Sequence, residues 1–451
     1  MPAAATMADV PDSPPFAYLD HAATTPLRPE ARAAMLPWLG ERFGNPSGAH
    51  GVARAARQAI DEARDTVAAV LGCAPNEIVF TSGGTEADNM ALLGVPAARP
   101  GTVLASAVEH HAVLEPLAEV GGRTVGVDRR GLVDLDALAA ALQAAPDTTL
   151  VSVMAANNEV GTVQSLAAVA RVVRKHAPGA ALHTDAVQAA AWIDVADVAA
   201  RADLVSVSGH KVGGPQGVGV LVVRRGTPLR ARALGGGQER ELRSGTHNVA
   251  GIVGLAAALA AKAAARADEA FRVAALRDRL ADGLLAEIPD AFETAVPSTA
   301  GTRPPPAPGD AAPVGSGSTG LAGAPERAHL LPGTVHLTIA GVESEALLFL
   351  LDEAGVGASA ASACASGAQE ASHVLAALGV PLPATAGALR LSLGWTSTDA
   401  DVDRVLEVLP TAVGKLRAAS GHVFTATAEP APEGGPIAPH SGAGSSGRGA
   451  P

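Results

Sequence analysis

Cysteine and aromatic residues are scarce in this chain of 451 residues. The two cysteines, Cys73 and Cys364, stand far apart, which excludes a disulfide framework and a zinc site made of cysteine alone. Aromatic residues make up 2% of the chain and hydrophobic residues 48%, so Ala, Val and Leu must form most of the core. Small side chains of this kind suit helices packed closely on a sheet.

Clustered positive charge and long apolar runs are also lacking. The net charge of -12 and the pI of about 5.5 argue against a surface that binds nucleic acid directly. The first fifteen residues lack the basic start and apolar run of a secretory signal, and no later stretch reaches the roughly eighteen apolar residues of a membrane span. We therefore expect a cytoplasmic protein that contacts neither membrane nor nucleic acid.

Short β-branched runs alternate with alanine-rich stretches from about Phe16 to Val223, which is typical of a mostly parallel sheet covered by helices. A long helical segment then extends to about Ile288. After a stretch rich in Pro, Gly and Ser, a second and smaller α/β part follows. The expected strands are 77–81, 102–106, 149–154, 181–184, 203–208, 218–223, 333–339 and 388–393, and the expected helices include 53–71, 166–176, 344–354, 373–378 and one after Asp399.

Lys211 lies at the end of an expected strand and just before a glycine-rich turn. Ligand sites of α/β proteins form at this edge of the sheet. A lysine presented there can hold an aldehyde cofactor such as pyridoxal phosphate (PLP) as a Schiff base. Taken alone, such a lysine is more often a solvated loop residue.

Two further strand ends carry groups that PLP needs. Asp185 follows the expected strand 181–184 and could face the pyridine nitrogen, although such a residue is more often a helix N-cap. Thr81-Ser-Gly-Gly-Thr supplies a strand, two glycines and a helix start, which suits a phosphate, although most such segments are only turns. The spacing of these motifs leaves PLP and nucleotide binding both open.

A longer series of motifs favours PLP over nucleotide binding. In chain order these are Leu19-Asp-His-Ala-Ala-Thr-Thr-Pro, Phe43-Gly-Asn-Pro-Ser, Phe80-Thr-Ser-Gly-Gly-Thr-Glu-Ala-Asp-Asn, Glu109-His, Asn157-Asn-Glu-Val-Gly, Asp185-Ala-Val-Gln, Ser208-Gly-His-Lys, Gly235-Gly-Gly-Gln-Glu-Arg, Arg243-Ser-Gly-Thr, Ser362-Ala-Cys and Arg390-Leu-Ser-Leu-Gly. From about Tyr18 to Ala418 the chain resembles the NifS/IscS-type cysteine desulfurases, which are class V aminotransferase-like enzymes of PLP fold-type I.

The resemblance implies a role for each matching residue. Lys211 would carry PLP as a Schiff base, Asp185 would pair with the pyridine nitrogen, and His110 would stack on the ring and relay protons. Arg390 would bind the substrate α-carboxylate with its planar fork. The remaining cofactor contacts would come from Gly84, Thr85, Asn158, Gln188, Ser208, His210 and, from the other subunit of a homodimer, Thr246, while Asn45 and Asn158 would contact the substrate.

Cys364 lies among small residues, where a cysteine is most often a buried hydrophobe. Its match to the desulfurase loop favours a nucleophile instead. The resemblance implies that L-cysteine becomes L-alanine while its sulfur passes to Cys364 as a persulfide. Iron-sulfur scaffolds or tRNA-thiolation enzymes would accept the sulfur. No resident metal is expected, although Cys364 could transiently ligate an iron-sulfur cluster, and Cys73 is expected to be structural.

The resemblance also implies how the chain is divided. A fold-type I transferase has a large, mostly parallel sheet domain and a smaller α/β C-terminal domain. We place the large PLP-binding domain at residues 16–265 and the small domain at 266–420, with a flexible insertion at 297–324 and a mobile catalytic loop near 357–370. Residues 1–15 and 421–451 are expected to be disordered. The insertion, His247 and Trp395 depart from the usual family pattern.

Two other functions stay open at this point. The chain could be another fold-type I PLP enzyme, such as an aminotransferase or a selenocysteine lyase, with an incidental cysteine. It could also be a silent scaffold for sulfur-relay partners, which the intact Lys211, Asp185, His110 and Cys364 argue against.

Overall fold

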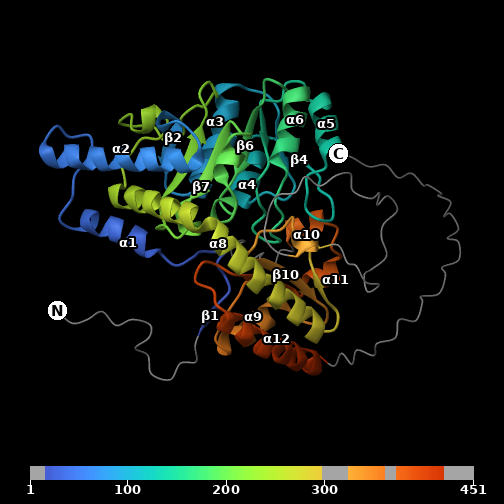
Figure 1. The fold of residues 1–451 in the computed structure, drawn as a ribbon. Coiled ribbons are helices and arrows are strands. Elements are labelled where there is room, and N and C mark those ends of the chain that lie inside the picture. Colours follow the sequence, from blue (N-terminus) through green and yellow to red (C-terminus); the bar gives the residue numbers. More distant parts are fainter. Residues whose placement is uncertain (1–15, 297–323, 361–371, 421–451) are drawn as a thin grey trace, which may run out of the picture.

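The computed structural model describes residues 16–296, 324–360 and 372–420. A seven-stranded sheet forms its larger part (Figure 1). All neighbouring strands run parallel except β8, which is antiparallel to both of its neighbours. This confirms the mostly parallel sheet. In sheet order the strands are β2 (Ile78–Thr81), β8 (Gly219–Val223), β7 (Leu204–Ser208), β6 (Ala181–Asp185), β5 (Leu150–Ser152), β3 (Val103–Ser106) and β4 (Arg123–Val125).

Helices cover both faces of this sheet. On one face α3 (Gly84–Ala98) and α4 (His111–Glu119) pack on side chains such as Val79 and Leu221. The other face carries further helices, whose buried residues share one core with Ile78 and Val205. These helices are α2 (Gly51–Leu71), α5 (Leu135–Ala144), α6 (Leu166–His176), α7 (Val195–Ala199) and the first half of α8 (Val249–Glu287).

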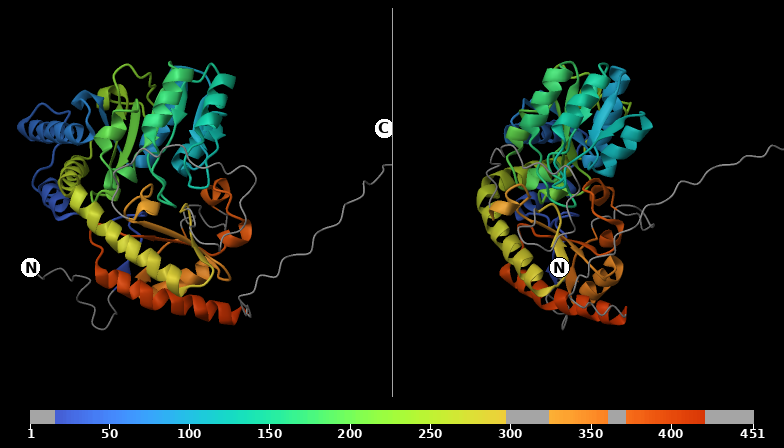
Figure 2. Two further views of the ribbon diagram at one scale, coloured as in Figure 1. Left: turned by 45° about the vertical axis from the view of Figure 1, so that its right-hand side comes forward. Right: turned by 90° about the vertical axis from the view of Figure 1, so that its right-hand side faces the viewer.

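The smaller part is built on a three-stranded antiparallel sheet with the order β12-β10-β9. α8 extends along both parts, and α12 lies beside its second half (Figures 1 and 2). The elements of this part are β9 (Ala291–Glu293), β10 (Thr334–Ile339), α9 (Ser344–Glu353), β11 (Val356–Gly357), α10 (His373–Ala377), α11 (Leu382–Thr385), β12 (Ala388–Ser392) and α12 (Asp399–Ala419).

The N-terminal segment connects the two parts. β1 (Ala17–Tyr18) pairs in parallel with β11 of the smaller part, and α1 (Pro29–Met35) packs on α8. The short 3-10 helices are η2 (Leu36–Leu39), η3 (Pro75–Glu77), η4 (Ala189–Ala191), η5 (Gly209–Lys211), η6 (Glu239–Glu241) and η7 (Pro325–Arg327). The expected domain boundary after residue 265 falls inside α8 and stays a prediction.

Helix α8 is the one helix among the described residues that is long and apolar enough to cross a membrane. Half of its apolar window is buried inside the protein, and the helix contacts α1, α2 and α12. α8 is therefore a core helix. Cys364 lies outside the described residues, as do residues 297–323 of the predicted insertion at 297–324, most of the predicted catalytic loop and both terminal segments.

Candidate active site

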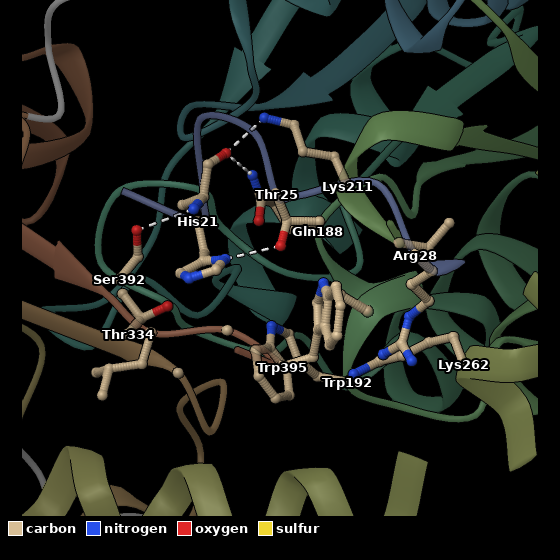
Figure 3. Close-up of a pocket in the computed structure, with 16 residues that line it drawn as sticks. His21, Thr25, Arg28, Gln188, Trp192, Lys211, Lys262, Thr334, Ser392 and Trp395 are labelled. Carbon is tan, nitrogen blue, oxygen red and sulfur yellow. Dashed lines mark hydrogen bonds between the residues drawn. The ribbon is translucent and has the colours of Figure 1, made fainter. Parts of the chain in front are cut away.

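Lys211 ends η5, directly after β7 at the carboxyl edge of the large sheet. Its Nζ donates hydrogen bonds to the carbonyl oxygens of Ala22 (2.5 Å) and Ala23 (2.7 Å). The side-chain amide of Gln188 donates to the same Ala22 oxygen at 2.9 Å. Figure 3 shows both side chains pointing toward this carbonyl. The segment before α1 thus brings Lys211 and Gln188 together.

Asp185 is the last residue of β6, and its Oδ1 accepts a hydrogen bond from the Val187 N–H at 2.8 Å. The side chain is buried, with 6% of the residue exposed. Burial and the charge of Asp88 raise the pKa of Asp185 to about 7, although Lys211 opposes the shift. A buried carboxyl of this kind ionises fully only when a cation faces it, and a protonated pyridine nitrogen is such a cation.

His110 is the N-cap residue of α4. Its Nδ1 accepts a hydrogen bond from the Ala112 N–H at 3.0 Å, so this nitrogen carries no proton. Burial, followed by the charges of Lys211, His111 and His373, lowers the pKa of His110 to about 4. At neutral pH the ring is therefore uncharged with its proton on Nε2. A neutral imidazole can stack on another aromatic ring and can still accept a proton on demand.

A cavity of about 350 Å³ opens at the first turn of α3. Gly83, with φ of +157°, and Gly84 form the turn between β2 and this helix. A Cβ on Gly84 would lie 2.7 Å from the Val187 side chain, so the turn has no room for a larger residue. Free N–H groups at a helix start bind phosphate readily. The cavity is lined by Ala23, Thr24, Ser82, Gly83, Gly84, Thr85, Glu86, Ser208, His210, Gln216 and Gly217.

His210 and Ser208 reach this cavity from the segment that carries Lys211. His210 Nδ1 lies 3.2 Å from the Thr24 hydroxyl, and burial together with the charge of Lys211 lowers its pKa to about 4. The structure thus gathers the predicted phosphate contacts Gly84, Thr85, Ser208 and His210. Because Lys211 lowers the pKa of His110, Asp185 and His210 alike, all three lie within reach of its charge.

Arg390 lies on β12 of the smaller part and is 4% exposed. One guanidinium nitrogen pairs with Asp20 Oδ1 at 2.8 Å, and another donates to the Asn158 carbonyl at 2.9 Å. Within the described residues its Nε has no hydrogen-bond partner. The guanidinium group of Arg390 is buried and has donors suited to a carboxylate ligand, which would take the place of Asp20.

Asn45 and Thr246 are not brought into this group. Both are exposed, and neither lines the cavity at α3 or the smaller one beside Lys211. Asn45 Oδ1 instead accepts the N–H of Ser47 at 3.0 Å. Their roles stay predictions, as does the role of Cys364.

A second cavity, which no sequence pattern predicts, lies on the side of Lys211 that faces α8. Figure 3 shows Trp192 and Trp395 below Lys211, with Arg28 and Lys262 beside them. Arg28 lies 4.8 Å from the Trp395 ring centre and Lys262 lies 4.4 Å from that of Trp192. Glu269 pairs with both cations. Trp395 therefore serves as the stacking partner of Arg28, a pairing across the fold that no local pattern reveals.

Comparisons with known proteins agree with this geometry. The family model described as Aminotransferase class-V matches residues 17–304. An IscS-like cysteine desulfurase of Mycobacterium tuberculosis is 41% identical over 419 residues, which cover 90% of this chain and 98% of the relative. A cysteine desulfurase of Gluconacetobacter diazotrophicus is 43% identical over 412 residues, which cover 89% and 94%.

Solved structures agree as well. A NifS-like protein superimposes with a TM-score of 0.76 at 34% identity, covering 89% of this chain and all of that chain. SspA, solved in complex with cysteine, gives a TM-score of 0.67 at 29% identity, with coverages of 84% and 99%.

The chain therefore belongs to the class V aminotransferase family, whose members depend on PLP. Within that family it is an enzyme of the NifS/IscS cysteine desulfurase type. The resemblance to the NifS/IscS-type cysteine desulfurases and the predicted fold-type I architecture are both confirmed.

Proposed function

We propose that this protein binds PLP through Lys211 and converts L-cysteine to L-alanine, with transfer of the sulfur to Cys364 as a persulfide. The observation that carries the proposal is the convergence of Lys211, Asp185 and His110 on one sheet edge beside the cavity at α3. The residues present fit PLP, because a glycine-lined helix start suits its phosphate and a buried acid with a raised pKa suits its ring nitrogen. When bound, PLP withdraws electrons from the substrate Cα.

Each side chain has a definite task in this proposal. Asp185, as an anion, holds the proton of the ring nitrogen in place. Lys211 Nζ lies at the sheet edge, where it would hold PLP and would take the proton from the substrate Cα. His110 is uncharged with its proton on Nε2, so it would stack on the ring and could accept a second proton. Arg390 orients the substrate through its carboxylate.

Cys364 belongs to the proposal on the basis of its sequence. The Ser362-Ala-Cys match and the desulfurase relatives support it as the sulfur acceptor. An unperturbed thiol has a pKa near 8.5, so a base must raise its thiolate fraction at neutral pH. The other cysteine does not fit this role, because burial raises the pKa of Cys73 to about 11.

We further propose a cytoplasmic homodimer in which Thr246 completes the phosphate site of the other subunit and Asn45 contacts substrate. The exposure of both residues supports this arrangement. The sulfur would pass to an iron-sulfur scaffold protein or to a tRNA-thiolation enzyme.

The experiment compares Cys364→Ala with Cys73→Ala as the matched control. Given L-cysteine and PLP, the wild type and Cys73→Ala should form alanine and persulfide, whereas Cys364→Ala should lose sulfur transfer yet keep the cofactor absorbance. Undiminished sulfur release from Cys364→Ala would contradict the role of this cysteine and favour a lyase or another PLP enzyme. A protein that stays colourless with added PLP would contradict the cofactor assignment.

A further inference from the structure

Three acids and one imidazole are buried together on the α3 side of the large sheet. Asp88 comes from α3, Glu109 from the turn before α4, and His183 and Asp185 from β6. Because side chains alternate along a strand, His183 and Asp185 point to the same face. Asp88 is 1% exposed, and Glu109 and His183 are fully buried.

Hydrogen bonds join these groups. His183 Nδ1 lies 2.8 Å from the Ser152 hydroxyl, and its Nε2 lies 3.0 Å from the Ser206 hydroxyl and 3.5 Å from Asp88 Oδ1. The Ser206 side chain also acts on Asp88, and the Ser152 side chain acts on Glu109, because each hydroxyl opposes the rise in the pKa of the acid beside it. Hydrogen bonds thus join Ser152, His183 and Ser206, and the two acids lie at the ends of this chain, Glu109 beside Ser152 and Asp88 beside Ser206 and His183.

The chain ends beside Asp185. Ser206 is the residue of β7 that stands opposite Asp185 in the strand pairing, and the charge of Asp88 acts directly on Asp185. Glu109 is held from the other end, because its Oε1 accepts the Met154 N–H at 2.6 Å. Its Oε2 has no hydrogen-bond partner among the described residues. A buried carboxylate oxygen without a partner is costly, and a proton on the carboxyl group removes its charge.

Positive charge within this cluster is too weak to ionise all three acids. Burial lowers the pKa of His183 to about 4, so the imidazole is neutral. The charge of Lys211 favours the ionised form of Asp185 but does not offset its burial. Burial raises the pKa of Asp88 to about 7 and lifts that of Glu109 well above its usual value, with Asp185 and Asp88 adding to the shift of Glu109. Like charges this close cannot all ionise near neutral pH.

We propose that Asp88 and Glu109 retain protons in the working enzyme so that Asp185 alone carries the negative charge of the cluster. Asp88 is then a positioning residue, which lies beside Ser206 and His183 and acts on the cofactor through Asp185. A ring nitrogen cation facing Asp185 would favour its ionised form, and the negative charge of Asp185 would in turn favour the protonated form of Asp88. This inference rests on the proposed PLP site and adds the residues that set the charge of its acid.

The test is a pH titration of aspartate carboxyl signals by NMR in protein labelled with ¹³C at the aspartate side chains. In cofactor-free wild type, the signals of Asp88 and Asp185 should titrate together near neutral pH. In Asp88→Asn, the proton affinity of Asp185 should fall at least about tenfold, because the neighbouring charge is gone. Asp185→Asn should lower the proton affinity of Asp88 in the same way, and the exposed Asp136→Asn should change neither.

Adding PLP supplies a second readout. The Asp185 signal should stay that of a carboxylate over the whole range, and the Asp88 titration should move to higher pH. An Asp185 titration unchanged by Asp88→Asn, or wild-type signals of both residues that titrate as ordinary surface acids, would overturn the inference. If Asp88→Asn does not fold, the titrations of the wild type with and without PLP still test whether Asp88 keeps its proton while Asp185 is ionised. Failure of the proposed function would look different, since the wild type would then bind no PLP.

Discussion

Glu239 is a buried carboxylate whose charge should contribute measurably to stability. It is 7% exposed, and it accepts hydrogen bonds from Arg64 (2.6 Å), His247 (2.8 Å) and the Phe80 N–H (2.9 Å). Its backbone φ is +47°, an unfavourable value for a residue with a side chain, and these bonds hold it there. Glu239 thereby ties the segment that leads to Thr246 to strand β2, which ends at the proposed phosphate turn.

The size of the effect follows from its pKa. Burial alone would raise the pKa of Glu239, but the bonds from His247 and Arg64 outweigh burial and lower it from 4.5 to about 2. A difference of this size between folded and unfolded chains corresponds to about 3 kcal/mol of stability. Since the folded pKa is the lower one, this contribution is complete above the unfolded value and is lost as the pH falls toward 2. About 1 kcal/mol of this contribution to the free energy of unfolding should be lost at pH ~4, and about 2 kcal/mol at pH ~3.

The assay is urea unfolding of wild type and Glu239→Gln, followed by circular dichroism at several pH values. At neutral pH the variant should be about 3 kcal/mol less stable, and the gap should narrow to about 1 kcal/mol near pH ~3. Glu241→Gln, an exposed neighbour in the same 3-10 helix, should differ from wild type by less than about 0.5 kcal/mol. A Glu239→Gln variant as stable as wild type, or a gap that does not change with pH, would refute this reasoning.

Two further predictions concern the proposed active site. Arg390→Lys should raise KM and lower kcat/KM by about 100-fold, because lysine cannot bind a carboxylate in the bidentate way, while the exposed Arg279→Lys should leave both constants unchanged in steady-state assays. His110→Gln should lower kcat by roughly 10²- to 10⁴-fold, which stopped-flow absorbance can follow. Because the pKa of His110 is about 4, its protonation should reduce the wild-type rate only as the pH falls toward 4. A transition near 6.5 that disappears in His110→Gln would show that this ring is charged at higher pH than the structure indicates.

Local patterns in the sequence predict much of this fold and a large part of the site. β6, β7 and β8 lie within a residue of their expected positions, because each is an unbroken run of buried residues, and β7 and β8 consist mostly of Leu and Val. The edge strand β4 was not predicted, since two of its three residues are exposed and no such run marks it.

The active site likewise contains residues that local patterns predict and residues that they do not. Lys211 and Asp185 follow predicted strands, so their common sheet edge could be foreseen. The carbonyls of Ala22 and Ala23 that hold Lys211, and the acids Asp88 and Glu109 behind Asp185, could not. Their burial depends on packing between distant segments, and no local pattern separates a buried acid from a solvated one.

The most direct test of the central claim is to identify the residue that carries the cofactor. The purified protein, loaded with PLP, is reduced with borohydride, digested and analysed by mass spectrometry. The account predicts that the cofactor mass is found on the peptide containing Lys211 and is lost in Lys211→Ala, while Lys262→Ala, which removes the buried lysine of the neighbouring cavity, still carries it on Lys211. Cofactor mass on another lysine of the wild type, or none on any peptide, would contradict the account.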